Sequence, residues 1–270
     1  MPMLLTPWES ETRLVGMYIA TGLLKGEQAQ SVLLIAPPGQ GKTAMINRFS
    51  PLPTTRRISD LTSNGIRGVM RKDSNGNLRH LLMPEFERLF SRDRSVSSQA
   101  ANLLCNLMTG DAGEELIGRE EYDFSERQVA IIGAMTTDVF RQRREMLKET
   151  GMLSRFHLLP IERDEEEKKR VIAAIANQNY DDLSPVNWPE LKQPREVACD
   201  PGYGEPILTW LDSTNLKYDE RFVARVIILL KACALLNNRS AVTDHDLRTL
   251  MTFTPFFEQK KDVRIVWPVS

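Results

Sequence analysis

The most informative residues of the chain are Ala36-Pro37-Pro38-Gly39-Gln40-Gly41-Lys42-Thr43. They fit the phosphate-loop pattern GxxxxGK(S/T), except that Ala36 stands in place of the first glycine. The order matters because glycines keep side chains out of a tight turn whose backbone N–H groups surround phosphate oxygens at a helix N-terminus. Lys42 then reaches the β- and γ-phosphate oxygens, and the Thr43 hydroxyl binds Mg²⁺. We therefore predict a nucleotide site formed by Pro38, Gly39, Gln40, Gly41, Lys42 and Thr43.

The segments on either side of this loop have the patterns of a strand and a helix. Residues 31–36 form a short, almost wholly apolar run, which is typical of a parallel strand covered on both faces, and a helix is predicted from about Lys42. Similar apolar runs recur at 57–61, 78–83, 129–134 and 157–161. Helical patterns are found at 9–24, 97–108 and 138–149. Strands that alternate with helices predict an α/β fold, with a doubly wound parallel sheet between layers of helices.

After residue 161 the sequence has helical patterns alone. Helices are predicted at 164–177 and 218–237, and a polar, proline-containing stretch at 180–205 predicts a loop. Thr243 followed by Asp246 has the spacing of a capping box at the start of another helix. We therefore predict an α/β nucleotide-binding core with an N-terminal helix at 1–162, an all-helical domain at 163–251 and a C-terminal tail at 252–270.

The overall composition excludes several classes of protein. The 270 residues carry 35 Lys and Arg against 36 Asp and Glu, so any affinity for nucleic acid must come from local patches. Charges interrupt every apolar run before the roughly 20 residues that cross a bilayer, and the N-terminus lacks a secretory signal pattern. The three cysteines show no CxxC spacing, which argues against a zinc site or a disulfide framework and favours a cytoplasmic protein.

Further stretches, in order along the chain, resemble the AAA+ ATPases, and within them the branch of the minichromosome-maintenance helicases and sigma-54 activators. Residues 81–86, Leu-Leu-Met-Pro-Glu-Phe, resemble the Walker B strand. The resemblance places Glu85 where the family polarises the attacking water, and Pro84 where the family has the aspartate that holds Mg²⁺. Loss of that carboxylate is expected to weaken metal binding and slow hydrolysis, with Glu87 as an alternative ligand.

The remaining motifs of the resemblance follow Walker B. Residues 99–118 resemble the helix and acidic insertion of that branch, and the acidic part is equally typical of a solvated hairpin or loop. Residues 129–137 resemble the sensor 1 strand, with Thr136 as the sensor and Thr137 as the alternative. Residues 151–156 resemble the segment of the arginine finger, which is Arg155 and acts on a neighbouring subunit's site. The all-helical domain resembles the family's lid, with Arg221 or else Arg225 as sensor 2.

The resemblance implies an ATPase that uses ATP and Mg²⁺, assembles into a homo-oligomeric ring or helix, and acts on DNA as a replication helicase or helicase loader, in the setting of a phage or other mobile element. The region 55–80 adds positive charge without aromatic residues, which favours contacts with a phosphate backbone. Its candidate DNA-binding residues are Arg67, Arg71 and Lys72. Residues 141–148 form a second basic run, suited to DNA or to contacts between subunits. A protein-remodelling ATPase and a slowly hydrolysing, ATP-dependent assembly platform are the alternatives.

Overall fold

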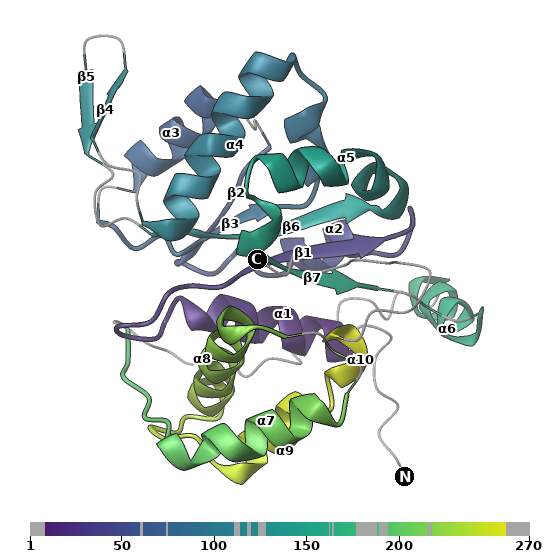
Figure 1. Cartoon of the computed structure of the whole chain (residues 1–270). Helices are drawn as coiled ribbons and strands as arrows, with labels where there is room; N and C mark the ends of the chain where they lie inside the picture. The colour runs from purple at the N-terminus through teal and green to yellow at the C-terminus, as the bar shows by residue number, and fades with distance from the viewer. Residues whose placement is uncertain are drawn as a thin grey trace.

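The computed structural model describes residues 9–59, 62–73, 75–110, 114–117, 120–123, 128–161, 163, 165–176, 188, 194–214, 216 and 218–257. Its centre is a five-stranded sheet in the order β2-β3-β6-β1-β7, and every neighbouring pair is parallel (Figure 1). The strands are β1 (Ser31–Ala36), β2 (Thr55–Arg57), β3 (His80–Met83), β6 (Ala130–Thr136) and β7 (Phe156–Pro160). The predicted α/β fold with a parallel sheet is therefore confirmed.

The helices lie in layers above and below this sheet (Figure 1). Those with at least six residues are α1 (Glu9–Thr21), α2 (Lys42–Asn47), α3 (Ser63–Lys72), α4 (Arg94–Thr109), α5 (Thr137–Glu149), α6 (Glu165–Ala176), α7 (Gly204–Asp212), α8 (Glu220–Leu236) and α9 (Asp244–Met251). The shorter ones are α10 (Thr254–Phe257) and the 3-10 turns η1 (Phe86–Phe90), η2 (Leu153–Arg155) and η3 (Pro201–Tyr203).

Strand β1 shows how the two layers form, because successive side chains of a strand point to opposite faces. Leu33 and Ile35 belong to the hydrophobic core under α3, α4 and α5. Val32 and Leu34 belong to a second core, shared with α1 and α2. All six residues of β1 are buried, as the uninterrupted apolar run predicted.

The second core continues into the C-terminal helices. Figure 1 shows α1 directly below the sheet, with α7, α8 and α9 beneath α1. Trp210 of α7 and Leu230 of α8 are buried in the same core as the lower face of β1. Phe253 and Phe257 also lie in it, so this helical part continues beyond residue 251 to the end of α10.

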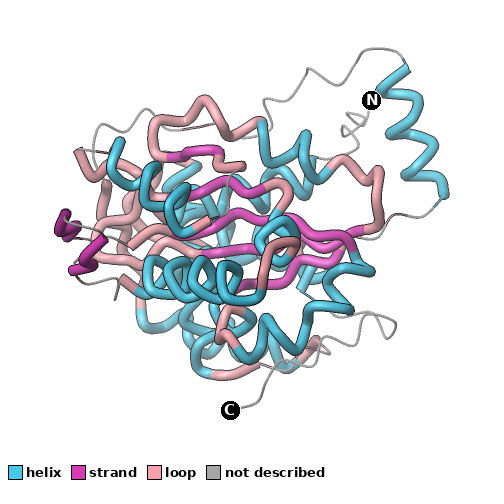
Figure 2. The backbone as a smooth tube through the Cα atoms, turned by 90° about the horizontal axis from the view of Figure 1, so that it is seen from above, coloured by secondary structure: helices cyan, strands magenta, loops and turns pink. Residues whose placement is uncertain are grey.

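Several boundaries differ from those predicted by the sequence. The second strand is β2 at Thr55–Arg57 rather than 57–61, since Ile58 only caps the ladder by donating its N–H to the Leu82 carbonyl. Helix α7 was not predicted, and its first two residues fall at the end of the predicted loop at 180–205. The acidic insertion contains a two-stranded antiparallel hairpin, β4 (Glu114–Ile117) and β5 (Glu120–Asp123), which stands apart from the main sheet (Figure 2).

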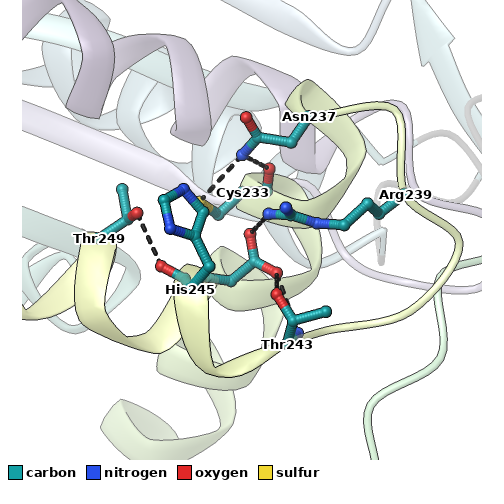
Figure 3. Close-up of polar contacts among 7 residues, drawn as sticks. Cys233, Asn237, Arg239, Thr243, His245 and Thr249 are labelled. Atoms are coloured by element: carbon teal, nitrogen blue, oxygen red, sulfur yellow. Dashed lines mark hydrogen bonds and ion pairs between the residues drawn. The ribbon is translucent and has the colours of Figure 1, made fainter.

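The predicted capping box at Thr243 is present at the start of α9. Asp246 is fully buried and accepts hydrogen bonds from the Thr243 N–H and hydroxyl, both at 2.9 Å. Arg239, from the connection between α8 and α9, forms an ion pair with the same carboxylate. Figure 3 shows Arg239 and Thr243 converging at this junction, beside Asn237, which donates to the Cys233 carbonyl. The junction therefore fixes the angle between the two helices.

Within the described residues, no helix combines the length and the hydropathy of a membrane span.

Candidate functional site

The phosphate loop, residues 36–43, connects β1 to α2 at the carboxyl edge of the sheet. Gly39 and Gly41 both have φ of +76°, a left-handed conformation that strains other residues, and Gly41 is the N-cap of α2. Nothing lies within 4 Å of the position that a Cβ of Gly39 would take, so the backbone conformation, rather than space, requires this glycine. Pro38, Gly39 and Thr43 are exposed and Gln40 is half-buried, which leaves the loop open to a ligand.

Lys42 is the exception in this open loop, because the residue is only 9% exposed. Its ammonium group donates to the carbonyls of Ala36, at 2.7 Å, and Pro37, at 2.9 Å. Burial lowers the pKa of Lys42, and the negative charge of Glu87 acts in the opposite direction. A positive charge is thus held against the inside of the loop, where the charge of the Glu87 carboxylate acts on it.

The two glutamates after β3 have different surroundings. Glu85 begins the η1 turn and forms an ion pair with Arg88, and its side chain is 42% exposed. Glu87 accepts a hydrogen bond from the backbone N–H of Thr136, at 3.0 Å, and also interacts with Lys42. The structure therefore turns Glu87 toward the phosphate loop, whereas the resemblance placed the water-polarising role on Glu85. Pro84, between the strand and these residues, is buried.

The end of β6 brings Thr136 to the same place. Thr136 is the register partner of Ala36, the first residue of the loop, and it is half-buried. It is also the N-cap of α5, but its side chain makes no capping hydrogen bond. Thr137 is the first residue of α5. Of the two threonines predicted as the sensor, Thr136 is the one whose backbone N–H donates to Glu87.

Arg155 lies elsewhere, at the end of η2 and just before β7. Its guanidinium donates to the carbonyl of Gly151, at 2.8 Å, and its Nε is buried without a partner. Within the described residues it makes no hydrogen bond or ion pair with the phosphate loop. The side chain thus folds back along its own segment, and a role in the site of a neighbouring subunit stays a prediction.

The two arginines predicted as sensor 2 also lie away from the loop. Arg221 is exposed at the start of α8. Arg225, one turn later, donates to the carbonyl of Ser154, at 2.7 Å, and to that of Phe156, at 3.5 Å. Arg225 therefore joins α8 to the segment that carries Arg155. No hydrogen bond or ion pair between described residues joins either arginine to the phosphate loop.

Sequence reasoning missed one residue of the site, Arg163. Its side chain is 3% exposed and bridges the backbone carbonyl of Gln40, at 2.9 Å, and the carboxylate of Glu11, at 3.0 Å. Arg163 follows β7 at the predicted domain boundary, and no motif distinguishes it. The only signal available was an arginine directly after a buried strand.

The predicted DNA-binding residues lie on α3. Arg71 and Lys72 are exposed in its last turn, and Arg67 is half-buried. The turn after α3 is held by the Asp73 carboxylate, which accepts from the N–H groups of Asn77 and Leu78, both at 3.0 Å.

A hollow of about 460 Å³ lies between the start of α4 and α5. Three arginines line it, Arg92, Arg94 and Arg143, together with apolar side chains that include Phe90 and Met146. Arg143 belongs to the second basic run of the sequence, so this arginine-lined hollow brings that run beside α4.

Comparisons with known proteins add little. No protein-family model matches the sequence, and no curated protein sequence is significantly similar to it. Among solved structures, the chain resembles the crystal structure of a protein from Cytophaga hutchinsonii described as a candidate ATPase. The two share 13% identity with a TM-score of 0.49, over 92% of this chain and 81% of the other. At this identity and TM-score, the likeness carries no argument about function.

Proposed function

We propose that this protein is an ATPase of the AAA+ type, which binds ATP with Mg²⁺ at the phosphate loop and hydrolyses it. One observation carries the proposal: the glycine-rich loop, the buried Lys42, Glu87 and Thr136 come together at the carboxyl ends of β1 and β6. This edge of a parallel α/β sheet is where such folds bind ligands.

Each residue then has a role that fits its position. Lys42 would exchange its two loop carbonyls for phosphate oxygens, and the exposed Thr43 hydroxyl would be the protein's ligand for Mg²⁺. When bound, the metal would neutralise part of the negative charge of the phosphates. Glu87, held by the Thr136 N–H, orients the attacking water. Thr136 reports the state of the γ-phosphate through the same bond.

The test is direct binding of ATP and of a non-hydrolysable analogue, with and without Mg²⁺, followed by a measurement of phosphate release. We expect Lys42→Ala to remove nucleotide binding and Thr43→Ala to remove its dependence on Mg²⁺. Arg248→Ala, on the exposed surface of α9, is the control and should bind as the wild type does. Absence of binding by the wild-type protein at millimolar ATP would reject the proposal.

A slow ATP-dependent assembly platform is the second candidate, because the buried Pro84 stands where the family resemblance places a metal-binding carboxylate. In Pro84→Asp, a large gain in hydrolysis rate would support this candidate. An unchanged rate would indicate that the other residues of the site already hold Mg²⁺ adequately.

DNA is the partner that we propose for the assembled protein, as a helicase or a helicase loader in replication. The exposed Arg71 and Lys72 and the arginine-lined hollow support it, since positive charge on α3, α4 and α5 suits a phosphate backbone.

Binding of single- and double-stranded DNA should be measured with an ATP analogue across salt concentrations. Charge reversal at Arg94 and Arg143 should weaken it and flatten its salt dependence, whereas Arg248→Glu should not. If the wild type shows no salt-dependent affinity at low ionic strength, the partner is not DNA and protein remodelling becomes the leading alternative.

A further inference from the structure

The buried contact between Arg163 and the phosphate loop has a consequence for the loop's geometry. The Gln40 carbonyl and the Gly41 N–H belong to one planar trans peptide group and point in opposite directions. Since Arg163 holds the carbonyl at 2.9 Å, it also fixes the direction of the Gly41 N–H, away from Arg163. Gly41 supplies one of the two backbone torsions that set the orientation of this peptide, and Gly39 comes one residue before Gln40; glycine backbones rotate more freely than those of other residues. Without Arg163 its orientation would be weakly determined.

The anchor of Arg163 is itself well fixed. Glu11, in the first turn of α1, accepts from the other terminal nitrogen of Arg163, at 3.0 Å. Near Glu11, Arg48 donates to the Thr12 hydroxyl at 2.8 Å, and the charge of Glu11 opposes the lowering of the Arg48 pKa by burial, to about 10. Helix α1 therefore contacts the loop through Arg163 and the far end of α2 through Arg48. The α1 helix also packs against α8, so the same anchor connects the loop to the helical part.

We propose that Arg163 is a positioning residue of the nucleotide site: it orients the Gln40–Gly41 peptide so that the loop's N–H groups face the phosphates before ATP arrives. The proposal rests on the nucleotide binding proposed above. Arg163 does not contact phosphate itself, because its side chain is 3% exposed and both terminal nitrogens already have partners. Its effect is preorganisation, which raises affinity by removing the cost of ordering the loop.

The test compares Arg163→Gln and Arg163→Lys with Arg48→Gln, a matched control that removes a partly buried arginine that contacts the same turn of α1. The measurements are the Kd of a fluorescent non-hydrolysable ATP analogue, the Tm without nucleotide, and hydrogen exchange of a peptide covering residues 39–42. Arg163→Gln should raise the Kd about tenfold, as expected for the loss of one hydrogen bond to a charged group. Arg163→Lys should have a smaller effect, since an ammonium can bond the Gln40 carbonyl but cannot also bridge to Glu11 as a planar fork does.

Arg163→Gln and Arg48→Gln should both lower the Tm. Only the two Arg163 variants should raise the Kd and speed hydrogen exchange in the loop. Equal Kd and equal exchange in the wild type and the Arg163 variants would overturn the inference. If Arg163→Gln does not fold, Arg163→Lys decides by the same two readouts. A wild type that binds no nucleotide would instead reject the proposed function, and the hydrogen exchange of the loop would still test the positioning.

Discussion

Glu85 and Glu87 are separated by a single residue, but we expect their substitutions to have very different effects on the rate of ATP hydrolysis. Glu87 is bound to the Thr136 N–H and interacts with Lys42, whereas Glu85 pairs with Arg88 at the surface. Glu87→Gln keeps the size of the side chain but removes the base, so we expect it to lower kcat about 100-fold or more, as for the loss of a general base. Glu85→Gln should lower it less than about threefold. Steady-state phosphate release by both variants is the measurement, with nucleotide Kd as the control. The reverse ranking would restore Glu85 to the role given by the family resemblance.

The two buried histidines of the chain allow a pH experiment. Burial lowers the pKa of His80 to about 3 and that of His157 well below its ordinary value of 6.5. Below pH 6.5 the unfolded chain binds protons that the folded chain excludes. The free energy of unfolding should therefore fall as the pH falls from 6.5 toward 3, by up to about 1.4 kcal/mol per pH unit for each buried histidine.

His80→Phe, which keeps an aromatic ring but cannot titrate, should reduce this slope. The slope is measured from the free energy of urea unfolding at pH 7, 6 and 5. If His80→Phe and the wild type had the same slope, the folded chain would have to bind the proton at His80.

At the scale of elements, the junction of α8 and α9 depends on one buried carboxylate, Asp246 (Figure 3). Its removal leaves Arg239 without its ion pair and the Thr243 N–H without its cap. We expect Asp246→Ala to lower the free energy of unfolding by about 3 kcal/mol, as when one partner of a buried ion pair is removed. Asp244→Ala, at an exposed position in the same turn of α9, should cost less than about 1 kcal/mol. Chemical denaturation compares the two variants, and similar losses would show that the cap does not hold the junction.

Elements with a strong local pattern could be predicted from the sequence, and contacts between distant segments could not. The apolar run of β1 and the capping box at Thr243 are both found where their patterns indicated. The phosphate loop could also be predicted, because its glycines form a local pattern. The roles of Glu85 and Glu87 depend on which side of the η1 turn each faces, and the Arg163 contact joins residues 123 positions apart. Such contacts depend on packing between distant segments, which the local sequence pattern does not encode.

At the scale of the whole molecule, the core and the helical part are connected through α1. Buried residues of α1, of the lower face of β1 and of α8 form one hydrophobic cluster. Arg225 adds a polar connection from α8 to the segment that carries Arg155. A movement of the helical part would therefore act on both the phosphate loop and the segment proposed to reach a neighbouring subunit, which is the coupling that the proposed function requires.

Assembly itself is tested by mixing two inactive variants. Arg155 is folded onto the Gly151 carbonyl in the single chain, so a role as an arginine finger requires it to leave that bond and enter the site of a second copy. Arg155→Ala should bind ATP but lose about 1000-fold in hydrolysis, as expected for a missing finger. Lys42→Ala should not bind ATP but still carries the finger.

In a random equal mixture, about one interface in four pairs an intact loop with an intact finger, so about a quarter of the wild-type rate should return. Phosphate release by the mixture, compared with each variant alone at the same total concentration, decides the matter. A mixture no more active than the two variants separately would place Arg155 outside the catalytic site and confine its role to the fold of its own segment.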